Sequence, residues 1–352
     1  MAEGNKYYPF QFRGSASEYF GIWIVNVLLS IVTLGIYGSW AKVRNKKYFY
    51  GQTFVDEHNF DYHATGMQLF IGKLIVLAVL AVFVVLQILA PILYLVALLI
   101  LLGILPAIII RALRFNARVS SYRNVRFNFM GEFGEAFITY FLLPIASFFT
   151  LYMITPIVSR ASNRFAINNH TYGDRSFEFN SNLGPYYKPF LGVLAVCIIL
   201  TIALMMPVVG AMISSFKEGG NDTDPELLTV FVVLAIYAVM FVAILPGVLF
   251  YQACVRNIVF NNTVLDGQHH FESTINPWRY IWIIITNTIA AIFTIGLLVP
   301  WGRVRFARYL AENTALITDG SLEGYSSSVG DTTGVVSSEY VDMEGFDVGL
   351  GI

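Results

Sequence analysis

Clusters of arginine and lysine beside tryptophan are the residues of this sequence best suited to chemistry, and that chemistry is the binding of anionic headgroups. Each cluster adjoins a long apolar run. A guanidinium group can pair with a phosphate through two N–H donors, and an indole ring favours the interface between lipid and water. The candidates are Trp40, Lys42, Arg44, Arg111, Arg114, Trp301, Arg303 and Arg305. In a simpler interpretation, the same basic residues only fix the orientation of the chain in a membrane.

Polar side chains inside apolar runs form a second set of candidates. Asn26 and Thr33 are seven residues apart and therefore share one helical face, and Asn287 and Thr294 have the same spacing. Such residues could line a polar path or a substrate site within a bilayer. They could equally form hydrogen bonds between packed helices. Because none of the four ionises, the sequence favours packing.

The histidines and several aspartates fall in short polar stretches, where they could act as acids and bases. These residues are His58, His63, His170, His269, His270, Asp56, Asp61, Asp174 and Asp266. Their spacing matches no common metal-ligand pattern, and neither nucleophile motifs nor phosphate-binding glycine loops are present. We therefore expect no metal and no cofactor. Enzymatic activity stays open, with a non-enzymatic protein favoured.

The elements that must position these residues are membrane helices. Of the 352 residues, 56% are hydrophobic and only 13% are charged. The run Met67–Ile110 contains one charge, Lys73, and is long enough for two crossings at about 20 residues each. Two further runs, Pro189–Phe216 and Leu227–Val255, carry no charge. Since a backbone in hydrocarbon must satisfy its own hydrogen bonds, these runs are expected to be helices.

One uncharged element occurs three times, at Tyr19–Ala41, Ala136–Val158 and Tyr280–Gly302. An internal repeat is the strongest sequence signal for the way a fold is built. The first and third copies share the Trp–Arg pairs named above, whereas the middle copy has Ile157 and Ala161 at those positions. Whatever the Trp–Arg pair does, it is needed in at most two copies.

Short aromatic stretches between the apolar elements predict four small β-hairpins. They cover residues 48–66, 115–131, 165–184 and 258–275, and turn-forming residues such as Asp266–Gly267 lie near their centres. A single hairpin is only marginally stable in water, so we expect the four to pack together.

Three of these segments carry a family resemblance. They are TLGIYGSWAKVRNKKY in the first copy, the aromatic stretch that ends in HATG, and TIGLLVPWGRVRFARY in the third copy. On these motifs the chain resembles the YjgN family of bacterial inner-membrane proteins over about residues 7–317. The resemblance implies a location in the bacterial inner (cytoplasmic) membrane. It implies no reaction, ligand or site, because none is established for the family.

These patterns predict an all-α polytopic membrane protein with internal repeats, made of seven hydrophobic helical segments with small β-hairpins between them. The expected membrane domain covers residues 1–317. Its repeat copies lie at about 10–66, 127–184 and 271–317, and its helix pairs at 67–112 and 185–255. Residues 318–352 are rich in glycine, serine and acidic side chains, which predicts a disordered tail.

The function predicted from these features is that of a non-enzymatic protein, either a repeat-built transporter or pore, or a lipid-interacting protein. The alternative is a membrane enzyme that acts on lipid or envelope material through the histidines and aspartates. Membrane lipids with anionic headgroups are the expected partners. Nucleic acid is not expected, because every basic cluster adjoins a membrane segment. A homo-oligomer stays open.

Two membrane topologies compete. If every repeated element crosses the bilayer, the seven crossings place the first two β-hairpins opposite the last two and divide the basic clusters between both sides. That division is unfavourable by the positive-inside rule. If each element instead breaks near Thr33–Leu34–Gly35 or its equivalent and turns back, every β-hairpin and basic cluster faces the cytoplasm. We expect the second topology, with four crossings and three re-entrant helical hairpins.

Overall fold

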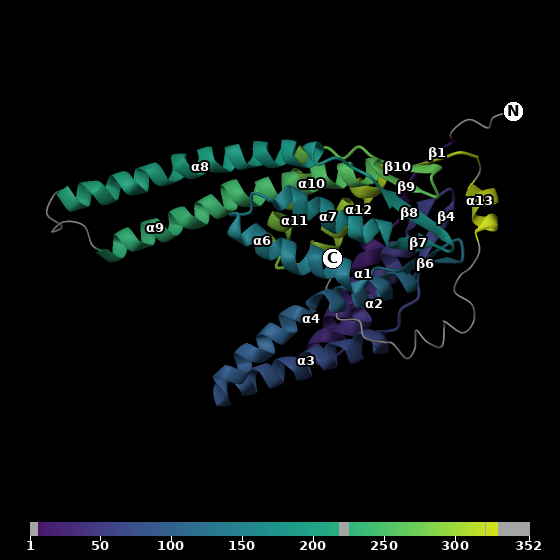
Figure 1. Ribbon diagram of the computed structural model, residues 1–352, viewed down its shortest axis with the longest axis horizontal. Coiled ribbons are helices and arrows are strands. Elements are labelled where there is room, and N and C mark those ends of the chain that lie inside the picture. Colours follow the sequence, from purple (N-terminus) through teal and green to yellow (C-terminus); the bar gives the residue numbers. More distant parts are fainter. Residues whose placement is uncertain (1–5, 218–224, 321, 330–352) are drawn as a thin grey trace.

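Short antiparallel strands gather at one end of the molecule, and the helices extend from them (Figure 1). The structure, a computed structural model, describes residues 6–217, 225–320 and 322–329. The strands are β1 (Lys6–Pro9), β2 (Gln11–Phe12), β3 (Thr53–Val55), β4 (His58–Tyr62), β5 (Ser120–Tyr122), β6 (Val125–Phe129), β7 (His170–Tyr172), β8 (Arg175–Phe179), β9 (Thr263–Leu265), β10 (His269–Ser273) and β11 (Thr314–Thr318). They form one sheet in the order β1-β11-β10-β9-β8-β7-β6-β5-β4-β3-β2.

The N-terminal segment closes this sheet into a ring. Only Phe10 separates β1 from β2, yet β1 pairs with β11 and β2 pairs with β3 at the opposite edge. The amide of Phe10 itself donates to the carbonyl of Thr314 at 2.9 Å. One interrupted strand therefore satisfies both edges that an open sheet would expose.

The ring also fixes where the helices leave the sheet. Because neighbouring strands alternate in direction, the four tight turns lie at one rim, and every helical connection leaves and returns at the other. We refer to these as the turn rim and the helix rim. The helices are α1 (Ala16–Val32), α2 (Gly38–Gly51), α3 (Gly66–Leu89), α4 (Pro91–Arg118), α5 (Phe133–Phe137), the π-helix η1 (Ile138–Leu142), α6 (Leu143–Phe149), α7 (Thr155–Asn168), α8 (Gly184–Lys217), α9 (Pro225–Val239), the π-helix η2 (Met240–Ile244), α10 (Leu245–Asn261), α11 (Pro277–Phe293), α12 (Val299–Glu312) and α13 (Leu322–Ser328).

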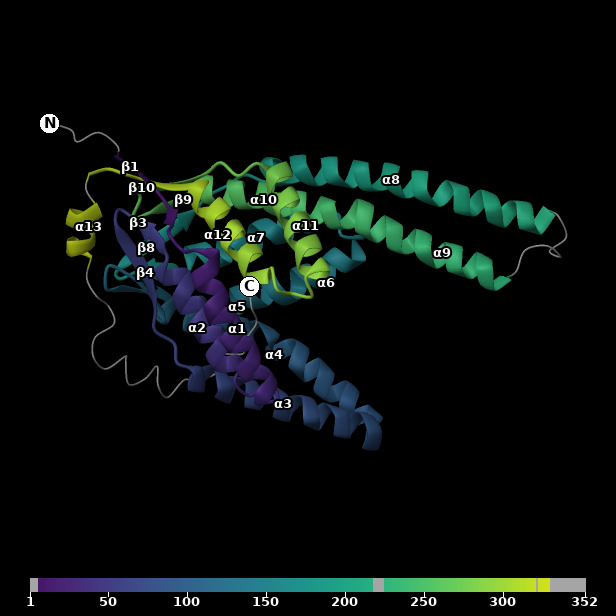
Figure 2. The ribbon, with the colours of Figure 1, turned by 180° about the vertical axis from the view of Figure 1, so that it is seen from behind.

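Two of the connections are long arms, and the other three are short helical hairpins. The first arm is the pair α3/α4, and the second arm runs from α8 to α10; the two arms diverge as they leave the ring (Figure 2). Capping fixes where helices begin. The Thr65 hydroxyl accepts from the amide of Gln68, and the Gln68 side chain accepts from the Thr65 amide, which forms a capping box at the start of α3.

The short hairpins are the elements α1/α2, α5–α6/α7 and α11/α12, and each breaks at the same place. The residues with positive φ are Leu34 (51°), Gly35 (85°), Leu151 (50°), Tyr152 (64°), Ile295 (51°) and Gly296 (89°). In each turn an amide donates at 2.7 Å to the carbonyl five residues earlier: Gly35 to Ser30, Tyr152 to Ser147, and Gly296 to Ala291. Glycine adopts this left-handed conformation without strain, which non-glycine residues do not. The predicted break near Thr33–Leu34–Gly35 and its equivalents is confirmed.

The prediction of an all-α fold is wrong. The eleven strands form one hydrogen-bonded ring that organises the whole chain, whereas the predicted fold class counted the β-hairpins only as small elements between helices. The four β-hairpins lie within the predicted stretches, but their union depends on pairing between distant strands, such as Phe60 with Tyr122 and Phe177 with Leu265. Helical connections separate these partners in the sequence.

The prediction of seven hydrophobic membrane helices is also wrong. In the described part of the chain, three helices are long and apolar enough to cross a membrane: Gly66–Leu89, Pro91–Arg118 and Gly184–Gly210. The repeated elements break in their middle, which leaves Ala16–Val32 and Phe133–Phe149 as shorter apolar helices. A helix of 17 residues rises about 26 Å, less than the roughly 30 Å hydrocarbon core.

The predicted tail, residues 318–352, falls mostly outside the described residues. Its described part contains the end of β11 and the helix α13, which lies beyond the turn rim at the far end from the arms (Figure 1). Leu322 and Val329 are buried, and Tyr325 packs beside them, against a hydrophobic cluster that includes Tyr122 and Leu265 of the ring. This helix therefore covers the turn rim.

Substitution of Leu322 tests the packing of α13. We expect Leu322→Ala to lower the free energy of unfolding by about 2–4 kcal/mol, because it leaves a cavity between α13 and the ring. Ser328→Ala is the matched control, since Ser328 is exposed on the same helix and its loss should be nearly neutral. Chemical unfolding of the detergent-extracted protein measures both. Equal stability of the two variants would contradict the packing of α13 on the ring.

Candidate functional site

Aromatic side chains fill the inside of the ring. Phe10 stacks on Phe60 with 6.1 Å between ring centroids, and Phe60 contacts Tyr122 at 4.9 Å. The series continues through Tyr172, Phe127, Phe177 and Phe271. Alternate residues of a strand point to one face, and six strands, β4 to β8 and β10, each contribute an aromatic side chain to this core. These side chains belong to one hydrophobic cluster that joins the strands of the ring.

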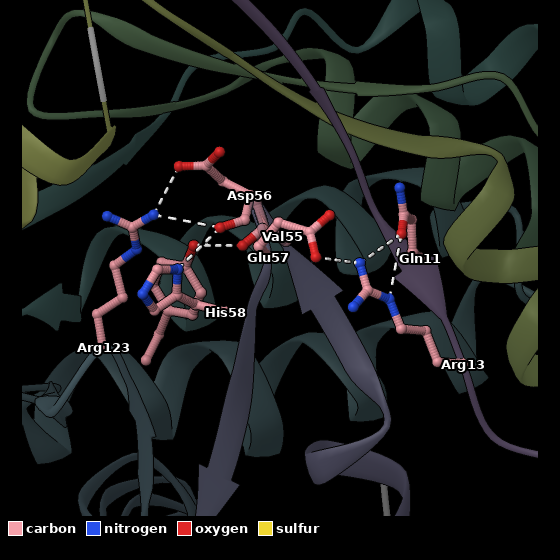
Figure 3. A network of polar contacts seen from close by, with 8 residues as sticks. Gln11, Arg13, Val55, Asp56, Glu57, His58 and Arg123 are labelled. Carbon is pink, nitrogen blue, oxygen red and sulfur yellow. Dashed lines mark hydrogen bonds and ion pairs between the residues drawn. The ribbon is translucent and has the colours of Figure 1, made fainter.

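Ion pairs join the turns at the turn rim. Arg123, in the turn between β5 and β6, donates to the carboxylate of Asp56 at 2.6 Å, and its guanidinium is almost fully buried (Figure 3). On the opposite part of the rim, Arg175 pairs with Asp266 at 3.2 Å and with Asp174 at 3.3 Å. These aspartates neutralise arginines, so their arrangement is that of structural ion pairs.

The histidines predicted as possible acid–base groups are dispersed around the ring. The ring nitrogen Nε2 of His63 lies 2.7 Å from the hydroxyl of Ser121, and Nδ1 of His58 lies 2.8 Å from the carbonyl of Asp56. His269 is buried, and its ring meets that of Tyr325 of α13 at 4.1 Å. Burial lowers the pKa of both His63 and His269 below the usual value. Among the described residues, no three His, Cys, Asp or Glu side chains gather into a metal site.

The polar residues predicted within the apolar runs hold the short hairpins together. The hydroxyl of Thr33 donates to the carbonyl of Leu29 at 2.7 Å and accepts from the amide of Tyr37 at 3.0 Å, across the turn. Thr294 does the same with Ala290 and Leu298. Each threonine therefore satisfies a backbone amide that the break in the helix leaves without a helical partner.

The two asparagines join the helices of their own hairpins. Asn26 is buried, and its amide donates to the side chain of Asn45 at 3.1 Å. Asn287 donates to the carbonyl of Gly302 at 2.9 Å and accepts from the guanidinium of Arg305 at 3.1 Å. A side chain at position 302 would meet Asn287 at 3.1 Å, so glycine permits the close approach.

The two Trp–Arg pairs have different surroundings. Arg305 lies over the ring of Trp301 at 5.1 Å and also donates to the hydroxyl of Thr286 at 2.8 Å. Arg44, its equivalent in the first copy, is exposed. Trp40 instead packs on Phe70 of the first arm with 5.4 Å between ring centroids. The two copies therefore share a sequence motif but not a contact pattern.

The other basic candidates lie along the helices near the ring. Arg303 donates to the hydroxyl of Tyr19 at 2.9 Å, which joins the last hairpin to the first. Arg114 donates to the carbonyl of Phe129 at 3.3 Å, while Arg111 is exposed and Lys42 is partly buried. The structure does not bring the candidates into one site, and their role with lipid headgroups stays a prediction.

A long apolar groove lies beside the second arm. It has a volume of about 800 Å³ and runs between α8, α10 and α11. Along α8 it extends from Pro185 to Leu200, about 22 Å at 1.5 Å per residue. Gly247 of α10 allows the helices to approach, because a Cβ there would meet the side chain of Val193 at 2.7 Å. Its other side is formed by residues such as Phe250.

The end of the groove nearest the ring is polar. Lys188, Trp278 and Asn257 all contribute to its lining, and Trp278 is 71% exposed. This combination of a cation, an indole and an apolar trough is suited to an amphiphile with an anionic head. Sequence reasoning missed Lys188 as a site residue. The available signal was a single lysine immediately before the uncharged run Pro189–Phe216.

Comparison with known proteins finds relatives along nearly the whole chain. A family described as "Bacterial protein of unknown function (DUF898)" matches residues 7–343. The inner membrane protein YjgN of Salmonella typhimurium strain LT2 is 26% identical over 357 aligned residues, which cover 90% of each protein. The protein of the same name from Escherichia coli K12 is 34% identical over 139 residues, 39% of this chain and 35% of that one. No solved structure matches.

The different surroundings of Arg305 and Arg44 give a matched test. We expect Arg305→Gln to reduce stability by about 1.5–3 kcal/mol, because hydrogen bonds to Thr286 and Asn287 from a charged group are lost. Arg44→Gln should change stability by less than about 0.5 kcal/mol, since an exposed side chain is removed. Unfolding of both variants in the same detergent provides the measurement. A loss of similar size in both would show that the contacts of Arg305 contribute nothing specific.

Proposed function

The chain belongs to the DUF898 family of bacterial proteins of unknown function, and from that premise we propose that it is an integral protein of the bacterial inner membrane that binds phospholipid without catalysing a reaction. The observation that carries the proposal is the groove between α8, α10 and α11. The relatives from Salmonella typhimurium and Escherichia coli are inner membrane proteins by name, which supports the location.

The dimensions of the groove suit an acyl chain. Its length along α8 exceeds the thickness of one leaflet, which is about half of the roughly 30 Å hydrocarbon core. Residues such as Val196, Leu200 and Val242 give it an apolar lining. An acyl chain in the groove would place its headgroup beside Lys188, where the ammonium group can pair with phosphate.

The tips of the three short hairpins support insertion into lipid. Leu34 is 94% exposed, Leu151 is 80% exposed and Ile295 is 95% exposed. Neighbouring apolar residues, including Val32 and Phe293, are exposed as well. Exposed apolar patches of this kind mark contact with a membrane or a partner. In our proposal the three tips enter the bilayer part of the way, while the two arms cross it.

The lipid-binding proposal is favoured over the membrane enzyme by the polar groups of the ring. Asp56 and Asp266 are engaged with arginines, and His63 contacts a serine. None of these residues lines the groove. Repeated elements are also a common plan of transporters, but the groove between α8, α10 and α11 has an apolar lining that suits a lipid.

The ring also supports a one-sided topology. All four turns lie at the turn rim and every helical connection starts and ends at the helix rim, so each connection returns to the side from which it left. The basic residues of α2, the end of α4 and α12 lie in the parts of the helices close to the ring. By the positive-inside rule we place the ring in the cytoplasm.

Filling the groove tests the lipid-binding proposal. Gly192 lines the groove, and a Cβ atom there would meet no atom of another element within 4 Å. Gly192→Trp should reduce the phospholipid that copurifies with the protein about ten-fold, because the indole displaces at least two methylenes worth about 0.8 kcal/mol each. Quantitative mass spectrometry of extracted lipid is the measurement.

The control for this experiment is Gly103→Trp. Gly103 lies in α4 of the first arm, and a Cβ atom there also meets no atom of another element within 4 Å. The two substitutions therefore make the same change in two membrane helices, and only one of them fills the groove. Equal lipid retention in both variants and the unmodified protein would refute the proposed site.

Cysteine labelling tests the topology. Single cysteines replace Asn59 and Asp174 in a background without Cys197 and Cys254, and intact cells are treated with a membrane-impermeant thiol reagent. Both positions should be protected, because both belong to hairpins of the one ring. A cysteine at Lys217, where α8 ends far from the ring, should be labelled. Labelling at Asn59 or Asp174 would exclude a cytoplasmic ring.

A further inference from the structure

A second, open pocket lies where the ring meets the helices of the helix rim. It has a volume of about 350 Å³ and we name it the chamber. Its lining comes from the ring and from the ends of three helices, α2, α10 and α12. The aromatic residues of the lining are Phe10, Phe49, Tyr50, Phe60 and Phe260. Its size is within the usual range for small-molecule sites, about 300–1,000 Å³.

One arginine contributes the charge of the chamber. Arg256 of α10 lies in its wall, and its guanidinium is 4.2 Å above the ring of Phe260, one helical turn further along. It donates to the hydroxyl of Ser273 at 2.8 Å and to the hydroxyl of Thr314 at 2.9 Å. A guanidinium has five N–H donors, so these two contacts leave donors for a ligand.

No carboxylate neutralises this arginine among the described residues. Arginines that do pair with a carboxylate include Arg13, Arg123 and Arg175, whereas Arg256 has no such partner in the described part of the chain. Its polar partners are neutral hydroxyls on β10 and β11. A partly buried cation in an aromatic cavity is costly when it has no anion, and the contact with Phe260 offsets only part of that cost.

We propose that the chamber binds a small organic anion, a carboxylate on an apolar body, with Arg256 as its counter-ion. The aromatic walls would hold the apolar body, and the free N–H donors of the guanidinium would hold the carboxylate. An aromatic acid and a medium-chain fatty acid share this chemistry. The chamber is separate from the lipid groove, whose residues on α10 include Cys254 and Asn257 and neither Arg256 nor Phe260.

The competing explanation is that Arg256 only joins β10 to β11 at the helix rim. Ser273 and Thr314 face each other in the pairing of these strands, and Arg256 bonds to both side chains. This explanation predicts that loss of the arginine lowers stability but leaves anion binding unchanged. The affinities of the Arg256 variant for a charged probe and for its neutral analogue therefore distinguish the binding role from the structural one.

Calorimetric titration tests the chamber with the full chain in nanodiscs of zwitterionic phosphatidylcholine. The probes are 2-naphthoate, octanoate and the neutral analogue 2-naphthalenemethanol. The unmodified protein should bind at least one of the anions more tightly than the alcohol. Arg256→Gln should weaken binding of that anion about ten-fold or more, because a charged hydrogen bond is lost, and should leave the alcohol unaffected.

Two variants serve as controls. Arg13→Gln removes one positive charge from a partly exposed residue that pairs with Glu57 outside the chamber (Figure 3), and it should leave anion binding unchanged. Ala307→Phe fills the chamber without removing Arg256 and should abolish binding of every probe. If Arg256→Gln does not fold, the proposal is tested by Ala307→Phe and by the preference of the unmodified protein for anions over the alcohol.

Several outcomes would overturn the proposal. They are equal affinity of the unmodified protein for the anions and the alcohol, undiminished anion binding in folded Arg256→Gln, or undiminished binding in folded Ala307→Phe. Tighter binding of octanoate would indicate a fatty-acid source, and tighter binding of naphthoate an aromatic one; both support the chamber. None of these results depends on lipid in the groove, because Gly192→Trp leaves the lining of the chamber intact.

Discussion

The backbone pairing of the N-terminal segment is the interaction on which the rest of the structure depends. β1 and β2 bond to opposite edges of the sheet, and the amide of Phe10 between them bonds to Thr314. Without this segment, β3 and β11 would each present unpaired N–H and C=O groups. A closed ring has no such edge. It also places the first helical hairpin beside the last, where Arg303 bonds to Tyr19.

Closure explains the unusual lengths of the helical elements. A connection that must return to the rim it left can be a short hairpin or a long arm, but it cannot end on the far side of a membrane. The short hairpins meet this demand with a left-handed turn, and Thr33 and Thr294 satisfy the freed amides. In the first hairpin, Lys73 of the neighbouring arm also donates to the carbonyl of Gly35 at 2.8 Å. The turn is thus supported from both sides.

Local features of this fold could be predicted from the sequence, and long-range features could not. Composition predicts the apolar runs, and turn-forming residues predict the hairpin turns and the break at Gly35. The ring could not be predicted. Strands of three residues such as Thr53–Val55 are too short to show a sequence pattern, and Pro9 argues against a strand within a sheet. The site residues show the same division. Asn26 and Thr33 were recognisable from their spacing, whereas Arg256 is a single arginine after an uncharged run and its chamber forms only when distant elements meet.

The two arms carry different residues, with different contacts, at the position of Arg256. This difference concerns the proposed ligand site. Leu105–Pro106 and Leu245–Pro246 occupy matching places in the two arms, so Asn116 in α4 corresponds to Arg256 in α10. Asn116 accepts from the ammonium of Lys46 at 2.9 Å, and that ammonium also lies over the ring of Tyr62. A cation from the neighbouring helix thus fills the polar position of the first arm. In the second arm the cation belongs to α10 itself and faces a cavity. The position of Asn116 is therefore occupied by a cation of a neighbouring helix, whereas Arg256 lines an open chamber. This difference is expected if only the position in the second arm binds a ligand.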